Sequence, residues 1–164
     1  MTIFVKNKHT LQIDEFKFKC CIGKKGSTSN KKEGDKKTPK GTFKIENLYF
    51  RKDRKEKPST LLKCIEIKKN MGWCDDIGFP EKYNKLIKIE KKIGHEKLKR
   101  KDNKYDLLIP IKYNFKRPVI GRGSCIFIHL TKDYKPTTGC VALKEKDFLI
   151  MLKLIKKSTK IKIF

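Results

Sequence analysis

The chain has 164 residues, of which 37% are hydrophobic, with ten Phe and five Tyr, and its formal net charge at pH 7 is +25. This length predicts one domain over residues 1–164, and the supply of large apolar side chains excludes a disordered chain. The longest apolar runs are too short to cross a bilayer, so we expect no transmembrane segment.

The N-terminal segment MTIFVKNKHTLQIDEF lacks the continuous apolar stretch of a secretory signal. We therefore expect the chain, as it stands, to act in the cytoplasm. A periplasmic or cell-envelope location is the alternative if the sequence is a piece of a longer protein.

The positive charge comes from lysine, because the chain has 38 Lys against 5 Arg, together with 19 Ile and a single Ala. These proportions indicate the residue choice of an AT-rich genome, and the lysines are spread from end to end. Proteins that read bases or clamp phosphates favour arginine for its planar, forked guanidinium. We therefore expect no nucleic-acid partner, and a non-catalytic basic module that binds nucleic acid or another anionic polymer is a remote alternative.

The cysteines show no Cys-x-x-Cys pair and no zinc-ligand spacing. There are six of them: Cys20, Cys21, Cys64, Cys74, Cys125 and Cys140. We expect free thiols, most of them buried as small apolar side chains, and we expect no metal and no cofactor.

Alternation of apolar and polar residues predicts strands along most of the chain. They cover residues 16–23, 42–50, 61–67, 84–90, 104–114, 125–130 and 159–164, with 137–143 as a further short strand or turn. Residues 24–41, rich in Gly, Ser, Lys and Pro, predict a long loop, and such a loop in a compact domain is more often functional than idle. Residues 71–80 are expected to form a second loop.

A helical pattern is clear only over residues 144–157, which place apolar residues at 148, 149, 151, 152, 154 and 155 on one broad face. One or two other short helices are expected elsewhere. The fold class is therefore mainly β with minor α, closed by a late C-terminal helix and a final strand.

Cys140 follows His129 by eleven positions, and the intervening loop allows the end of one strand and the start of the next to lie together. A neighbouring imidazolium lowers the pKa of a thiol and yields the reactive thiolate. Gly139 leaves room for a substrate carbonyl, and the amides of residues 139–141 are candidates for an oxyanion hole. On spacing alone, a buried cysteine near an ordinary histidine is the simpler interpretation.

A set of short motifs stands in order along nearly the whole chain. These are GKKGSTSNKKEGDKKTPKGTF (23–43), GWCDD (72–76), YN (83–84), HEKL (95–98), YD (105–106), GRGSCIFIH (121–129) and PTTGCVAL (136–143). Each is weak alone, but the ordered set resembles the L,D-transpeptidase catalytic domain family of the YkuD type. The resemblance implies a mixed β-sandwich-like domain and catalysis at Cys140.

The same resemblance implies a peptidoglycan stem tetrapeptide or muropeptide as partner, with no statement about the oligomeric state. Cys140 would attack the carbonyl of the diamino acid and expel D-Ala, while His129 would shuttle the proton and the carbonyl of Leu130 would orient its ring. The acyl-thioester would pass to an amine, giving a cross-link, or to water, as in an L,D-carboxypeptidase of peptidoglycan recycling.

The sequence departs from the family pattern in one respect, because the Arg that usually follows the cysteine by two positions is replaced by Ala142. Arg122 is the substitute that we expect to hold a substrate carboxylate. Thr137 and Thr138 are assigned to substrate binding, and Trp73 either walls the cleft or packs in the core.

Three other pairs of motif residues have mainly structural interpretations. Glu33 and Asp35 are expected to anchor the long loop by pairing with a nearby Lys or Arg. Asp75 and Asp76 are expected to cap a helix or a turn. His95 and Glu96 are more readily explained as a structural pair than as part of a site.

Overall fold

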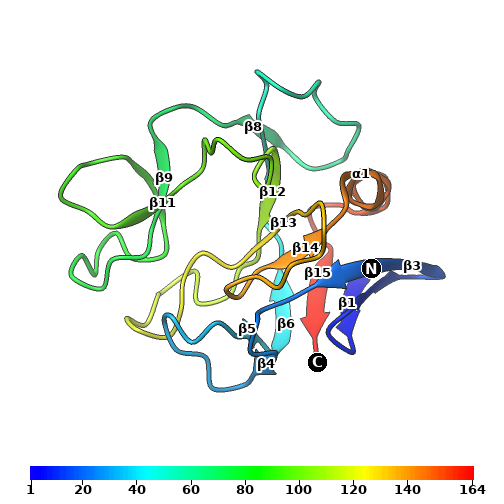
Figure 1. Ribbon diagram of the computed structural model, residues 1–164, viewed down its shortest axis with the longest axis horizontal. Coiled ribbons are helices and arrows are strands. Elements are labelled where there is room, and N and C mark those ends of the chain that lie inside the picture. The colour runs from blue at the N-terminus through cyan, green and yellow to red at the C-terminus, as the bar shows by residue number, and fades with distance from the viewer.

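The structure is a computed structural model that describes residues 1–164. It contains fifteen strands and one helix (Figure 1). In chain order the elements are β1 (Thr2–Lys6), β2 (Thr10–Ile13), β3 (Phe16–Cys21), β4 (Ser27–Thr28), β5 (Thr38–Pro39), β6 (Gly41–Lys44), β7 (Leu48–Phe50), β8 (Cys64–Glu66), β9 (Met71–Cys74), β10 (Leu86–Lys88), β11 (His95–Lys97), β12 (Leu107–Pro110), β13 (Phe127–Leu130), β14 (Val141–Leu143), α1 (Glu145–Leu154) and β15 (Lys160–Ile163).

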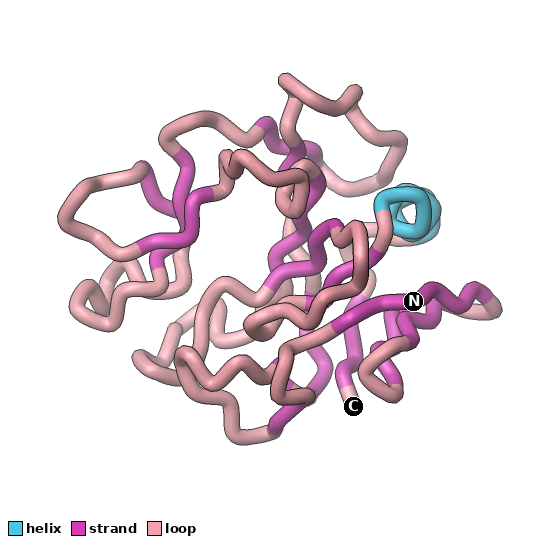
Figure 2. The backbone as a smooth tube through the Cα atoms, viewed as in Figure 1, coloured by secondary structure: helices cyan, strands magenta, loops and turns pink.

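Ten strands form one mixed sheet in the order β6-β15-β1-β2-β3-β14-β13-β12-β7-β8. The pairs β1–β15, β13–β14 and β7–β8 are parallel, and the other pairs are antiparallel. A bridge between Ile45 and Ile111 joins the two halves of the sheet beyond β6 and β12, so the sheet curls back on itself (Figure 2).

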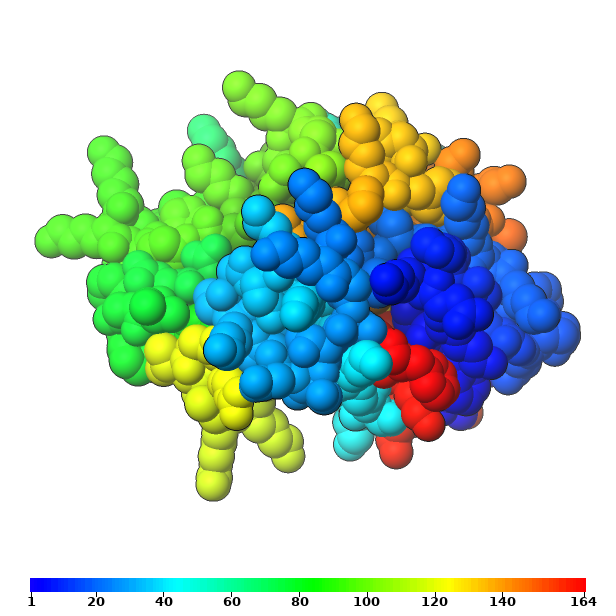
Figure 3. All heavy atoms as spheres, turned by 60° about the horizontal axis from the view of Figure 1, so that its bottom comes forward, coloured from blue at the N-terminus to red at the C-terminus, as the bar shows by residue number.

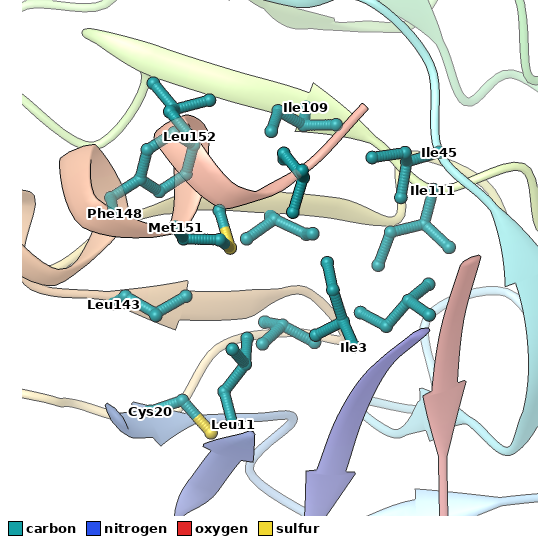
Figure 4. Packing of buried hydrophobic residues seen from close by; sticks show 14 of the residues in the cluster. Ile3, Leu11, Cys20, Ile45, Ile109, Ile111, Leu143, Phe148, Met151 and Leu152 are labelled. Carbon is teal, nitrogen blue, oxygen red and sulfur yellow. The ribbon is translucent and has the colours of Figure 1, made fainter. Parts of the chain in front are cut away.

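The main core fills the space inside this curl and contains 25 buried residues. Alternation in β1 and β15 directs Ile3, Val5, Ile161 and Ile163 into it. The helix α1 closes the core by burying Phe148, Met151 and Leu152, which pack over the sheet as Figure 4 shows. The mainly β, sandwich-like fold with a late helix is thus confirmed.

The central strands β12, β13 and β14 are buried at every position because both of their faces are covered. One face meets the main core. The other face meets a second core of eight buried residues, which is covered by the small sheet β10-β9-β11. The second core comprises Tyr49, Ile67, Trp73, Leu98, Tyr105, Leu108, Phe127 and Cys140. The candidate cysteine therefore lies at the margin of this second core.

Several sequence predictions need correction. Residues 71–74 are not loop but form β9, the middle strand of the small sheet, because Trp73 is an inward-facing core residue. The predicted strand 42–50 is two strands, β6 and β7, far apart in the large sheet, since the chain crosses at Ile45 to bridge Ile111. The hairpin β1–β2 was not predicted, and no helix other than α1 forms.

The loop 24–41 is confirmed apart from the two-residue strands β4 and β5. In Figure 3 this segment, in lighter blue, occupies the middle of one face, between the small-sheet region in green and the terminal strands in dark blue and red. All six cysteines are free, as expected. No helix combines the length and apolar character needed to cross a membrane.

Candidate active site

Strands β13 and β14 bring Cys140 and His129 together. The strands are parallel rather than a hairpin, with His129 opposite Ala142 and Ile128 opposite Val141, so Cys140 lies opposite Phe127. Side chains alternate along a strand, so residues 127, 129, 140 and 142 face the same side of the sheet. Accordingly, Cys140 and His129 both line one cleft of about 460 Å³.

The imidazole of His129 is fixed in one tautomer. Its Nδ1 lies 2.9 Å from the carbonyl oxygen of Leu130, which can only accept, so Nδ1 carries the proton and Nε2 is the free acceptor. The ring of Tyr105 packs edge-on against it, with 5.3 Å between ring centroids. Burial lowers the pKa of His129 to about 4, against the opposing effect of the Leu130 carbonyl. The imidazole is therefore a neutral base at pH 7.

The thiol of Cys140 is also neutral at rest. Its side chain is only 6% exposed, its Sγ accepts the amide N–H of Phe127 at 3.4 Å, and its S–H donates to the carbonyl of Cys125 at 3.2 Å. Burial raises the pKa of the Cys140 thiol to about 12. Burial thus disfavours the charged forms of both groups, whereas the sequence led us to expect a thiolate beside an imidazolium. No hydrogen bond joins the two side chains, since the thiol donates to the carbonyl of Cys125 instead.

The turn before Cys140 is built by Thr137. Its Oγ1 donates to the Cys140 carbonyl at 2.6 Å and accepts the Gly139 amide at 3.1 Å. Gly139 has φ of 151°, and a Cβ there would lie 3.0 Å from the carbonyl oxygen of Lys37. Of the amides proposed for an oxyanion hole, that of Gly139 is thus engaged, whereas that of Cys140 donates to no protein acceptor.

A second, smaller cleft of about 140 Å³ is also lined by Cys140. It shares Glu96, Tyr105, Thr138 and Cys140 with the first cleft. The charged residues that line the first cleft are Glu96, Arg100, Lys104, Asp133 and Lys135, and those of the second are Lys31, Glu33, Asp75 and Glu96. The first cleft is therefore richer in cations and the second in carboxylates, with the thiol between them.

Residues 1–163 match the family model of the YkuD type, described as the L,D-transpeptidase catalytic domain. The chain belongs to this family. No curated protein matches it. The structure of Bdellovibrio bacteriovorus Bd1075 resembles it with a TM-score of 0.50 and 19% sequence identity, over 99% of this chain and 47% of that protein. At this identity the likeness concerns the fold alone, and the chain spans about half the length of Bd1075.

In this L,D-transpeptidase domain, the residues assigned to substrate binding lie in different surroundings. Thr138 is exposed and lines both clefts. Trp73 is 2% exposed in the second core, so its side chain offers no surface to a ligand. Arg122 donates to the side chain of Asn30 at 2.7 Å and lines neither cleft. Thr137 lines the first cleft, but its hydroxyl is engaged in the turn.

Among the residues of the first cleft that were not singled out as site residues from the sequence are Glu96, Arg100, Lys104 and Tyr105. Glu96 and Tyr105 stand in the ordered motifs, and Arg100 is one of only five arginines, so signals existed for three of them. The guanidinium of Arg100 is held by Asp102 and Glu96, at 2.8 Å and 2.7 Å, and lies over the Tyr105 ring. Lys104 forms no ion pair, which leaves its ammonium available to a ligand.

The ordered motifs meet in one hydrogen-bonded network behind Cys140. Glu33, from the long loop, accepts the hydroxyls of both Tyr83 and Ser124, and the Tyr83 hydroxyl accepts the amide of Gly123 at 3.1 Å. Glu33 therefore anchors the loop through hydroxyl groups rather than the expected Lys or Arg. Asp35, by contrast, does pair with a lysine, Lys31, as predicted.

Asn84 forms the second half of this network. Its Oδ1 accepts the indole N–H of Trp73 at 3.0 Å and the amide of Cys125 at 3.2 Å, and its Nδ2 donates to the carbonyls of Tyr113 and Asn114. Cys125 has φ of 53°, so the chain is held there in a conformation that non-glycine residues rarely adopt. The network thereby fixes the Cys125 carbonyl that receives the thiol of Cys140.

We expect Tyr83→Phe to lower the free energy of unfolding by about 1–3 kcal/mol, because Glu33 and the amide of Gly123 lose the hydroxyl of the fully buried Tyr83 while its ring remains. Urea unfolding at constant protein concentration measures this change. Tyr134→Phe is the matched control, since the hydroxyl of Tyr134 forms no hydrogen bond, and its effect should stay within about 0.5 kcal/mol. Equal effects of the two variants would contradict the assigned network.

Proposed function

We propose that the protein is a cysteine-dependent L,D-transpeptidase that acts on peptidoglycan stem tetrapeptides through an acyl-thioester. The observation that carries the proposal is the shared cleft of Cys140 and His129, on adjacent parallel strands, within a chain of this family. The free Nε2 of a neutral imidazole is the base that such a reaction needs.

In the first half of the reaction, Cys140 Sγ attacks the carbonyl carbon of the diamino acid while the thiol proton passes to His129 Nε2. The carbonyl electron pair moves to oxygen, and the unengaged Cys140 amide is the donor placed to receive that oxyanion. The C–N bond then breaks, the imidazolium returns the proton to the leaving D-Ala amine, and an acyl-thioester remains. The Leu130 carbonyl holds the ring in orientation throughout.

In the second half, an acceptor amine attacks the thioester carbonyl and gives its proton to His129. The C–S bond breaks, the thiolate takes the proton back, and the new amide is the cross-link. We assign the contact with the substrate carboxylate to Lys104, with Arg100 beside it, because both line the first cleft and Lys104 is unpaired. Arg122 loses this role because it lies outside both clefts.

A second candidate is an L,D-carboxypeptidase, in which water takes the place of the amine. The size of the second cleft favours it, because about 140 Å³ has room for a few water molecules and much less than the first cleft offers. With water as acceptor, the protein would trim muropeptides, and we propose the cytoplasm as its compartment.

The test is incubation of the purified protein with disaccharide tetrapeptides, followed by mass spectrometry of the products. Release of D-Ala with formation of peptide dimers is expected for the transpeptidase. Accumulation of the tripeptide without dimers would identify the carboxypeptidase instead. If neither product forms, while the protein binds DNA or another polyanion with strong salt dependence, the enzymatic proposal fails in favour of a basic binding module.

A further inference from the structure

Lys31, in the loop 24–41, is a buried lysine next to the candidate nucleophile. Its side chain is only 3% exposed. Lysine is among the residues least often buried, and burial of its ammonium is costly unless a partner is present. The burial of the Lys31 side chain therefore needs an explanation, and neither the proposed mechanism nor the family resemblance supplies one.

The aliphatic stem of Lys31 occupies the space left by two glycines. A Cβ at Gly123 would lie 2.9 Å from Lys31 Cγ, and a Cβ at Gly139 would lie 3.8 Å from Lys31 Cε. Gly123 has φ of 100° and Gly139 has φ of 151°, so both positions favour glycine on conformational grounds as well. Because Gly139 directly precedes Cys140, the end of the Lys31 side chain lies beside the turn that carries the thiol.

The ammonium of Lys31 is held but not saturated. Its Nζ contacts Asp35 Oδ1 at 2.6 Å and the carbonyl oxygen of Lys32 at 2.7 Å. An ammonium has three N–H groups, so one is left without a protein acceptor. Lys31 lines the second cleft together with Cys140, which places this cation on the wall of the site.

Stability alone is a weak explanation for this buried pair. Desolvation of two charges often cancels their attraction, so an apolar residue of similar size is frequently as good or better in such a place. A loop anchor at this position would need only the apolar stem. The retained charge points instead to the neighbouring reaction, in which negative charge develops on sulfur and then on the carbonyl oxygen.

No other group that lines the second cleft supplies a positive charge. Burial raises the pKa of the thiol most, the amide of Phe127 and the Lys31 ammonium lower it, and the carboxylate of Glu96 raises it. Besides Lys31 and Cys140, the titratable groups that line the two clefts are Glu33, Asp75, Glu96, Arg100, Lys104, Tyr105, Cys125, His129, Asp133 and Lys135, and Cys21 also acts on the thiol. The cations Arg100, Lys104 and Lys135 line the first cleft and not the second. Lys31 is thus the cation acting on the sulfur from the second cleft.

We propose that Lys31 is a positioning residue whose buried ammonium stabilises the negative charge that develops at Cys140 during acylation. Asp35 holds the ammonium in place without covering its remaining N–H. The inference rests on the proposed function, since it supposes that Cys140 is the nucleophile, but its test reads the thiol directly.

The test compares the rate of Cys140 alkylation by iodoacetamide between pH 7 and 10, followed by intact mass and peptide mapping. Two variants break the same ion pair: Lys31→Met removes the cation and keeps an apolar stem, whereas Asp35→Asn keeps the cation. Lys31→Met is expected to slow alkylation about tenfold at each pH, equivalent to one pKa unit, and to lower kcat with little change in KM. Asp35→Asn should alkylate at least as fast as the wild type.

Lys32→Met is the matched control, because its exposed side chain carries the same charge one residue away. It should leave the alkylation rate unchanged. Equal slowing by Lys31→Met and Asp35→Asn would show a loop anchor and overturn the proposal, as would an unchanged rate in Lys31→Met. Because alkylation needs no muropeptide, failure of the proposed function would appear separately, as an inactive wild type whose thiol still responds to Lys31.

Discussion

A Cys140→Ser variant is expected to process tetrapeptides at least about 10⁴-fold more slowly than the wild type, because it loses the nucleophile around which the site is built. A serine hydroxyl is a weaker acid than a thiol, and His129, whose pKa is about 4, is a weak base for it. Single-turnover assays on disaccharide tetrapeptide measure the loss. Intact mass should show an acyl adduct on the wild type and none on the variant.

Cys64→Ser is the control for this substitution, since Cys64 lies on the edge strand β8 and lines neither cleft. It should retain full activity and the adduct. Activity of Cys140→Ser above one tenth of wild type would assign the chemistry to another group. Comparable melting temperatures of the two variants would exclude unfolding as the cause.

The fold was predictable where one face of an element is solvated. The strand 159–164 and the helix 144–157 both show their periods, because most of their outer positions are polar, although Leu149, expected on the buried face of the helix, is exposed together with Ile150. Residues 71–74 were mistaken for a loop, because this strand shows no alternation of apolar and polar residues. Its residues Gly72, Trp73 and Cys74 are all buried, and Gly72 packs on the ring of His95. Burial on both sides removes the pattern from which a strand is recognised.

The pairing of Cys140 with His129 was also accessible from the sequence, because both stand at the ends of short apolar runs within ordered motifs. The protonation states of the two side chains could not be predicted from the sequence. They depend on how deeply two adjacent side chains are buried, and burial by the second core comes from residues such as Leu108 and Tyr49, distant in the chain. Spacing alone therefore predicts the partners but not their charges.

The cations of the first cleft escaped prediction for a related reason. Arg122 stood beside the histidine strand and was chosen as the carboxylate contact, yet the turn directs it to Asn30. Lys104 reaches the cleft because the amide of Leu130 donates to its carbonyl and fixes the chain beside β13. With 38 lysines available, no sequence signal distinguished this one.

A His129→Gln variant is expected to lower kcat/KM about 10³-fold, because the amide keeps the volume of the ring but accepts no proton. In the wild type, kcat/KM should fall as the pH drops through about 4, where the Nε2 of His129 becomes protonated and can no longer take the thiol proton. A histidine with an ordinary pKa would instead place this acidic limb of the pH profile, the fall in kcat/KM at low pH, near pH 6.5. The position of the limb thus reports the burial of the imidazole, and His129→Gln should lack it.

The exposed His9 provides the control, since His9→Gln should leave both the rate and the acidic limb unchanged. A limb near pH 6.5 in the wild type would mean that the pKa of His129 is not lowered, contrary to the direction that burial imposes on it. Persistence of the limb in His129→Gln would assign it to a carboxylate of the clefts, of which Glu96 borders both. Either result would contradict the lowered pKa of His129 while leaving Cys140 as the nucleophile.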